Sequence, residues 1–180
     1  MATVLDSIDD DLAAWIVAQP VFFVATAPTG ADGHLNLSPK GYDTLRVLDP
    51  NTVAYLDLTG SGVETIAHLR ENGRITLMIC AFEGPPRIVR LYGTGDVVLP
   101  GDPEWTELVG HFGARAGARA VIRTRVERLS SSCGYSVPFM TLVGERPTLD
   151  QWAGRKSASE LDDYRAAKNA VSIDGLPGLD

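Results

Sequence analysis

Apolar and polar residues alternate along most of this chain in short runs that are separated by turn residues. The runs have the length and composition of β-strands, and they cover residues 21–26, 34–38, 44–48, 52–56, 74–82, 87–98 and 120–129. Connections such as Asp49-Pro50-Asn51 are too short for the crossover that a parallel pair needs. The pattern predicts a mainly β protein, a closed antiparallel barrel of six or seven strands with helical additions.

A strand, a glycine turn and a helix follow one another in the middle of the chain. The turn is Gly60-Ser61-Gly62, and residues 63–72 have a helical period that places His68 on the polar, exposed side. Such a turn leaves N–H groups free at the start of the helix, which is a potential anion site. Residues 74–82 are apolar on both alternations, which predicts a strand that is covered on both faces.

Three further regions are expected to be helical. One helix is expected over residues 7–18, where Ser7 could act as the cap. Another is expected over residues 102–112, which begin with Asp102 and a proline. Two capping-box spacings, at Thr148 and Ser157, predict two short helices between residues 147 and 170. Gly93 and Gly95 inside a strand indicate a bulge or the close approach of a neighbour.

Composition and charge narrow the class of protein. A chain of 180 residues is most economically one domain, and its net charge of −7 argues against nucleic acid or an anionic membrane as partner. Its two cysteines, one of them in an apolar strand, fit reduced thiols in the cytoplasm. No apolar segment reaches the roughly 18 residues of a membrane span. We therefore expect a cytoplasmic protein.

Local motifs give little direct evidence of chemistry. A dinucleotide fingerprint needs a third glycine where Thr65 stands, together with repeated βαβ units. The three histidines are too scattered to predict a metal site, and nothing near Cys133 supports a nucleophile. Lys40 follows a strand and Pro39, so its side chain is either held at a fixed place or simply solvated.

Several motifs in series resemble the pyridoxamine 5'-phosphate oxidase-related, FMN-binding split-barrel family. They span roughly residues 8–130, and they are Asn36-Leu37-Ser38-Pro39-Lys40-Gly41, the strand–turn–helix at 53–72, Gly73-Arg74-Ile75-Thr76-Leu77-Met78 and Arg90-Leu91-Tyr92-Gly93-Thr94-Gly95. The resemblance implies a six-stranded antiparallel split barrel over residues 1–130, with residues 131–180 as a helical extension packed on it. It also implies a homodimer with FMN in a groove at the dimer interface.

Carried over position by position, the resemblance also implies cofactor-binding residues. The segment 38–40 would lie along the flavin ring and ribityl chain, residues 57–59 would end the strand at the phosphate pocket, and residues 61, 64 and 65 would lie at the phosphate. The expected set is Ser38, Pro39, Lys40, Asp57, Leu58, Thr59, Ser61, Glu64 and Thr65. No catalytic acid or base is named, although Tyr135 is a side chain to examine first.

The chain departs from the family pattern at the phosphate. Glu64 and Thr65 stand where the family often has arginine and lysine, so the phosphate would depend on N–H groups, hydroxyls and Lys40. Near Trp152 the chain also lacks the family's arginine–histidine–arginine cluster, which makes vitamin B6 a poor candidate substrate. We expect an FMN-dependent oxidoreductase acting on another small molecule. The alternatives are a deazaflavin-dependent reductase and a non-catalytic protein that binds flavin or haem.

Overall fold

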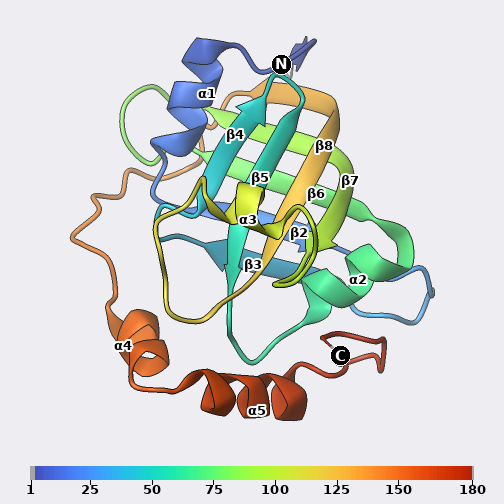
Figure 1. Cartoon of the computed structure of the whole chain (residues 1–180). Coiled ribbons are helices and arrows are strands. Elements are labelled where there is room, and N and C mark those ends of the chain that lie inside the picture. Colours follow the sequence, from blue (N-terminus) through green and yellow to red (C-terminus); the bar gives the residue numbers. More distant parts are fainter. Residues whose placement is uncertain (1–2, 180) are drawn as a thin grey trace.

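The computed structural model describes residues 3–179 as one curled antiparallel sheet with five helices around it (Figure 1). The strands are β1 (Thr3–Leu5), β2 (Phe22–Thr26), β3 (Asn36–Lys40), β4 (Leu45–Asp49), β5 (Thr52–Leu58), β6 (Arg74–Cys80), β7 (Ile88–Val98) and β8 (Ala118–Ser132). Their order is β3-β2-β6-β7-β8-β5-β4, and β1 pairs with β8. The split barrel is thus confirmed, but with eight strands rather than six. The three-residue β1 is too short to show a period in the sequence.

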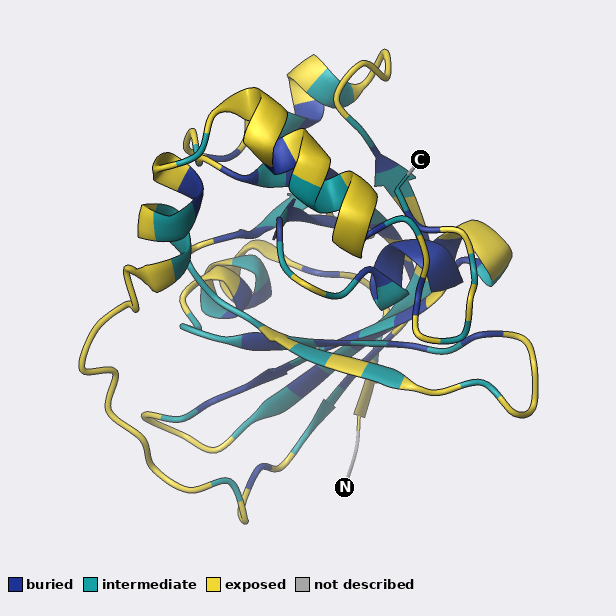
Figure 2. Cartoon of the chain, turned by 90° about the horizontal axis from the view of Figure 1, so that it is seen from below, coloured by how far each residue is buried: buried dark blue, intermediate teal, exposed yellow. Residues whose placement is uncertain are grey.

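The core fills the inside of the curled sheet. Alternate residues of the strands point into it, including the fully buried Tyr55, Leu77 and Leu91, and side chains from α1 (Asp10–Val17) and α2 (Glu64–Asn72) complete it. A smaller cluster lies on the other face of β5 and β8, under α3 (Trp105–Val109). Figure 2 shows the buried residues gathered along the strands and at the inner sides of the helices.

The structure corrects the expected burial of β6 and supports the expected close approach at Gly93 in β7. β6 is buried on one face only, since Thr76 and Met78 on its other face are partly exposed. The strand that is buried on both faces is β5, since α3 packs against its outer side. In β7, the register shifts between Tyr92 and Gly93, and a Cβ at Gly93 would lie 2.0 Å from the carbonyl oxygen of Arg125. Gly93 therefore marks both a bulge and a close approach.

The helix ends follow local hydrogen bonding. Asp9, rather than Ser7, caps α1 by accepting a hydrogen bond from the N–H of Leu12. Gly73, with φ of 71°, ends α2 in the left-handed conformation that glycine adopts without strain. α3 spans only residues 105–109, and the rest of the expected helix consists of turns.

The chain after β8 forms the two expected helices, α4 (Thr148–Gly154) and α5 (Ala158–Lys168). Ser157 and Glu160 form the capping box of α5, whereas Pro147 precedes α4 without a side-chain cap. The irregular segment 133–147 connects β8 to α4 and carries apolar side chains on the surface, including Tyr135 and Val143, which are 85% and 100% exposed. Among the helices of the described residues, none is long and apolar enough to cross a membrane.

Candidate functional site

The end of β3 presents polar side chains toward the inside of the barrel. Because side chains alternate along a strand, Ser38 and Lys40 are half-buried on the inner side, whereas Leu37 and Pro39 are exposed on the outer side. The Nζ atom of Lys40 lies 2.8 Å from Oδ1 of Asp57 at the end of β5, and its side chain remains 23% exposed. The structure thus brings together two of the expected residues, Lys40 and Asp57, and it turns Pro39 away from them.

Asp57 is the centre of a buried ion cluster. Its side chain is 1% exposed, and it accepts hydrogen bonds from Lys40 and from Nε of Arg119, at 2.7 Å. Burial by itself raises the pKa of Asp57, but the charges and hydrogen bonds of Lys40 and Arg119 outweigh burial and hold the pKa below its usual value. The carboxylate is therefore ionised, and the three charges together leave one net positive charge.

Arg119 is not among the expected site residues, and the strand geometry explains why. Asp57 pairs with Ala120 and Leu58 pairs with Ala118, so Arg119 is the extra residue of a β-bulge between β5 and β8. The bulge directs the Arg119 side chain toward Asp57. An arginine within an alternating strand would otherwise be read as a solvated side chain, and the only sequence signal is a charge placed in an apolar run.

The C-terminal extension is attached to the same strand end. Arg119 donates from Nη1 to Oδ1 of Asn169 at 2.9 Å and from Nη2 to the carbonyl of Gly62 at 2.8 Å. Asn169 in turn donates to the carbonyl of Gly60 at 2.9 Å. From α5, Nε of Arg165 donates to Oγ1 of Thr59 at 3.0 Å. The glycine turn is therefore held from both sides, by β8 and by the extension.

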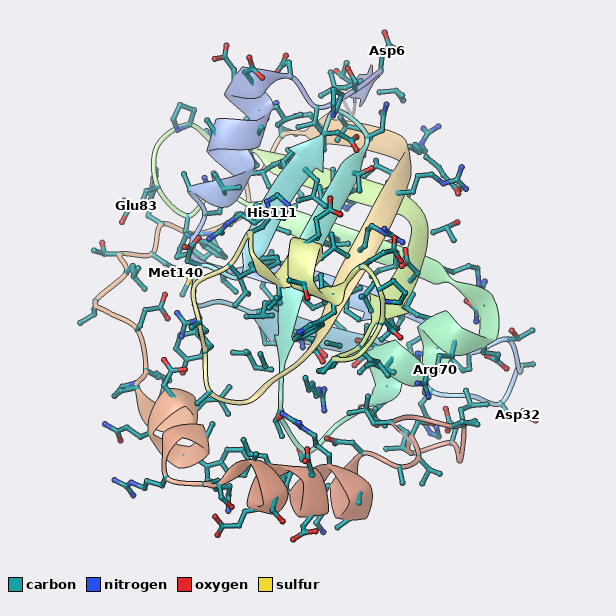
Figure 3. All side chains as sticks on the ribbon, in the orientation of Figure 1. Asp6, Asp32, Arg70, Glu83, His111 and Met140 are labelled. Carbon is teal, nitrogen blue, oxygen red and sulfur yellow. The ribbon has the colours of Figure 1, made fainter. Side chains whose placement is uncertain are left out.

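Further along, the C-terminal segment packs beside α2. Arg70 of α2 donates to the carbonyl of Gly178, and Figure 3 shows its side chain next to that segment. A Cβ at Gly178 would lie 2.8 Å from either Cγ of Val63, the residue before α2. The start of α2 is thus enclosed by the end of the chain.

The expected phosphate residues at this turn are differently placed. Ser61 is exposed, Leu58 is half-buried, and Thr65 is buried and accepts a hydrogen bond from Asn36 at 3.0 Å. The side chain of Glu64 folds back over the turn. Its Oε2 lies only 2.4 Å from the position that a Cβ at Gly62 would take. The carboxylate of Glu64 therefore occupies the start of α2, where a phosphate would meet a like charge. The Lys40 end of the site suits an anionic ligand, but the glycine turn does not.

A buried polar network continues from this site to α2. Asn36 lies between Ser38, Thr26 and Thr65, and Oγ1 of Thr26 lies 3.0 Å from Nδ1 of His68. His68 is fully buried rather than exposed as expected, because the end of β2 and the C-terminal segment cover the polar side of α2. Burial lowers the pKa of His68, although the charges of Asp174, Glu64 and Glu71 oppose this effect.

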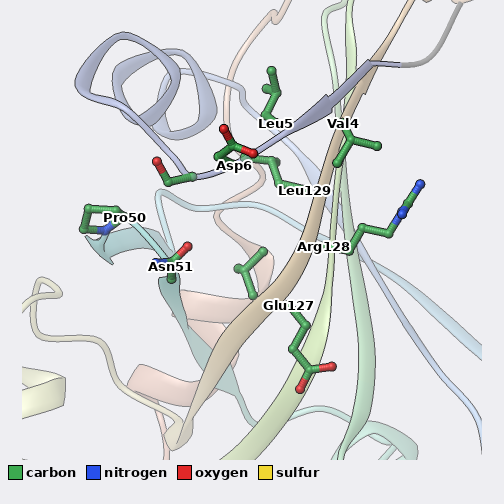
Figure 4. Close-up of a pocket in the computed structure, with 10 residues that line it drawn as sticks. Val4, Leu5, Asp6, Pro50, Asn51, Glu127, Arg128 and Leu129 are labelled. Carbon is green, nitrogen blue, oxygen red and sulfur yellow. The ribbon is translucent and has the colours of Figure 1, made fainter.

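Two buried polar atoms near the cluster lack a hydrogen-bond partner among the described residues. They are the hydroxyl of Tyr55 and Nε2 of His68. Burial, and to a lesser extent the charge of Asp57, raises the pKa of Tyr55, so the phenol is neutral. A cavity of about 270 Å³ lies elsewhere, between β1, the β4–β5 turn and β8, and none of the expected site residues lines it (Figure 4).

Comparison with known proteins shows which family this chain is similar to. The family model described as "Pyridoxamine 5'-phosphate oxidase" matches residues 8–133. The chain is also 42% identical over 191 residues to the pyridoxamine 5'-phosphate oxidase family protein ustO of Aspergillus flavus, an alignment that covers 97% of this chain and 76% of that protein.

Solved structures agree on the fold. HupZ of Group A Streptococcus, in its H111A form, matches with a TM-score of 0.54 and 24% identity over 69% of this chain and 99% of that one. A candidate pyridoxamine 5'-phosphate oxidase from Lactobacillus delbrueckii matches with a TM-score of 0.53 and 19% identity over 70% of this chain and 97% of that one. The fold, the matched residues and the identity to ustO together lead to one conclusion. The chain belongs to the pyridoxamine 5'-phosphate oxidase family.

Proposed function

We propose that this protein is a flavin-dependent oxidoreductase of the cytoplasm that binds FMN at the interface of a homodimer. The observation that carries the proposal is Lys40, which Asp57 holds at the open end of β3 with part of its side chain exposed. A lysine ammonium has three donors, and Asp57 occupies one of them. The other two are available to a cofactor oxygen.

The charge of the cluster supports an anionic cofactor. Arg119 is fully engaged by Asp57, Asn169 and Gly62, so it fixes the frame and leaves Lys40 as the accessible cation. FMN carries a phosphate and an electron-poor ring, and either would be stabilised beside an ammonium group. In this assignment the flavin supplies the redox chemistry, and the protein supplies binding, orientation and electrostatics. The substrate is a small molecule that the flavin oxidises or reduces.

The test is a comparison of FMN with riboflavin, which lacks the phosphate. Lys40→Met should weaken FMN about tenfold or more, equivalent to roughly 1.4 kcal/mol, while riboflavin changes much less. Lys168→Met is the matched control, because Lys168 is an exposed lysine of α5. Equal losses for both ligands would place Lys40 at the ring instead. Thermal melting of each variant separates loss of binding from loss of folding.

A second variant examines the glycine turn. If the phosphate approaches the start of α2, Glu64→Gln should tighten FMN by removing a like charge, and if the phosphate contacts only Lys40 the affinity should not change. The absorbance spectrum of the purified protein decides the cofactor class. A deazaflavin spectrum or a haem Soret band would point to one of the alternatives, and a parent protein that binds no flavin would refute the proposal.

A further inference from the structure

A second groove lies apart from the candidate cofactor site. It has a volume of about 550 Å³ and lies between α1, the loop before β7 and the paired ends of β1 and β8. Its principal side chains are Trp15, Arg87, Ser131, Cys133 and Tyr135. Ser131 lies in the same row of the sheet as Lys40, but three strands separate them. The volume is within the range of small-molecule sites.

Arg87 gives this groove a positive charge that no acid balances. Its guanidinium carbon lies 5.0 Å from the centre of the Trp15 ring, and its Nε donates to Oγ of Ser131 at 3.1 Å. No aspartate or glutamate lines the groove, and no carboxylate pairs with Arg87 among residues 3–179. In a chain of net charge −7, a half-buried arginine without an acid is a feature to explain. Its terminal N–H groups suit the two oxygens of a carboxylate.

Ser131 adds a hydroxyl donor beside the arginine. Ser131 accepts a hydrogen bond from Arg87, whereas Ser132, the next residue of β8, points to the opposite face of the sheet and accepts one from Nη1 of Arg90 at 3.2 Å. Because the Ser131 oxygen already acts as an acceptor, its hydroxyl hydrogen remains able to donate to a ligand. Arg90 lies on that opposite face, so Arg87 is the one cation among the described residues that line the groove.

The remaining surface of the groove is largely apolar. It is formed by the Trp15 ring, by Pro85 and Pro86, and by Tyr135, whose side chain is largely exposed. Contact with such a surface does not stabilise an inorganic anion. It stabilises an aromatic ring, because the contact removes apolar area of the ring from water.

We propose that this groove binds an aromatic carboxylic acid. The carboxylate is held by Arg87 and Ser131, and the ring lies against Trp15, Tyr135 and the two prolines. The assignment does not depend on a flavin, and it gives the protein a second small-molecule site.

Benzoate, benzamide and acetate test the two halves of the proposal separately. The chain has three tryptophans, so the indole N–H region of a 15N NMR spectrum holds three side-chain signals, and Trp15→Phe identifies the one from Trp15. Benzoate should shift the Trp15 signal and leave those of Trp105 and Trp152 unchanged. Benzamide, without the charge, and acetate, without the ring, should bind at least tenfold more weakly. Equal binding of benzoate and acetate, or equal shifts at all three tryptophans, would overturn the proposal.

Variants and thiol protection provide an independent check. Arg87→Met should abolish the benzoate shift, whereas Arg128→Met, at an exposed arginine outside the groove, should preserve it. Cys133 is exposed and Cys80 is buried, so a thiol reagent reads out the groove on the unaltered protein. Benzoate should slow the modification of Cys133 at least severalfold, and acetate should not. Unchanged benzoate binding in Arg87→Met, or an unprotected Cys133, would contradict the assignment.

Discussion

At the scale of single residues, Asp57 holds a buried charge that only its two cationic partners stabilise. Asp57→Asn keeps the shape of the side chain but leaves Lys40 and the 6% exposed Arg119 without a counter-charge. Breaking a buried ion pair in this way costs about 3–5 kcal/mol. We expect a loss of that size in the free energy of unfolding, measured by urea denaturation.

Asp96→Asn is the matched control for this change. Asp96 pairs with Arg123 at 2.9 Å, but its side chain is 51% exposed, and exposed pairs contribute about 1 kcal/mol or less. Equal, small effects of both substitutions would show that the cluster at Asp57 is not structurally important. Because the folded pKa of Asp57 lies below its ordinary value of 3.8, its contribution is present above that pH. It is lost as the pH falls through the lower, folded value.

Some residues of the candidate site could be predicted from the sequence and others could not. The difference lies in whether local strand pattern or tertiary structure brings a residue to the site. Lys40 and Asp57 lie at strand ends that the alternating pattern locates, so a family resemblance could identify them. Arg119 depends on a bulge, and Asn169 depends on how the extension folds back, 50 residues after Arg119 in the sequence. His68 was assigned to solvent because a helical period shows which residues share a side but not which side is covered.

At the scale of secondary structure elements, Gly93 fixes the junction of β7 and β8. Gly93→Ala places a methyl group about where the backbone carbonyl of Arg125 now lies, and backbone cannot move aside as a flexible side chain can. Overpacking of this kind costs typically 1–3 kcal/mol. We expect a lower melting temperature by at least several degrees, while Gly113→Ala, where nothing lies within 4 Å, should change it little. Equal melting of the two variants would mean that the bulge tolerates a side chain.

Strands were easier to predict than their surroundings. Alternation located seven of the strands because each has one face in the core, but it could not show that α3 covers β5 rather than β6. Ser7 and Asp9 are both good capping residues, and the structure uses Asp9. Such choices are made by tertiary packing, which local patterns do not contain.

At the scale of the whole molecule, exposed apolar side chains gather in two places. Leu35 and Leu37 at the edge strand β3 are 81% and 66% exposed, and Phe139 and Val143 in the segment 133–147 are 84% and 100% exposed. Apolar surface and a free strand edge are features that proteins usually cover. They support the proposal that two copies associate.

Light scattering tests this proposal directly. The protein at micromolar concentration should have about twice its chain mass of 19.3 kDa. Leu37→Glu and Val143→Glu should shift it toward the monomer, because each would bury a charge in the interface. Val4→Glu, in β1 at a position that is 54% exposed but outside both regions, should remain dimeric. A parent protein with the mass of one chain would exclude a dimer, and with it the proposed interfacial groove.

The attachment of α5 to the glycine turn also sets an order of events during synthesis. A growing chain that has reached Ser132 already holds Asp57 and Arg119, but Arg165 and Asn169 do not yet exist to secure Thr59 and Gly60. Chains fold from the N-terminus as they emerge, and a contact across 106 residues forms late because the intervening loop must first close. We therefore expect the barrel to assemble before the glycine turn is secured, and the candidate site to be completed only when α5 has folded back.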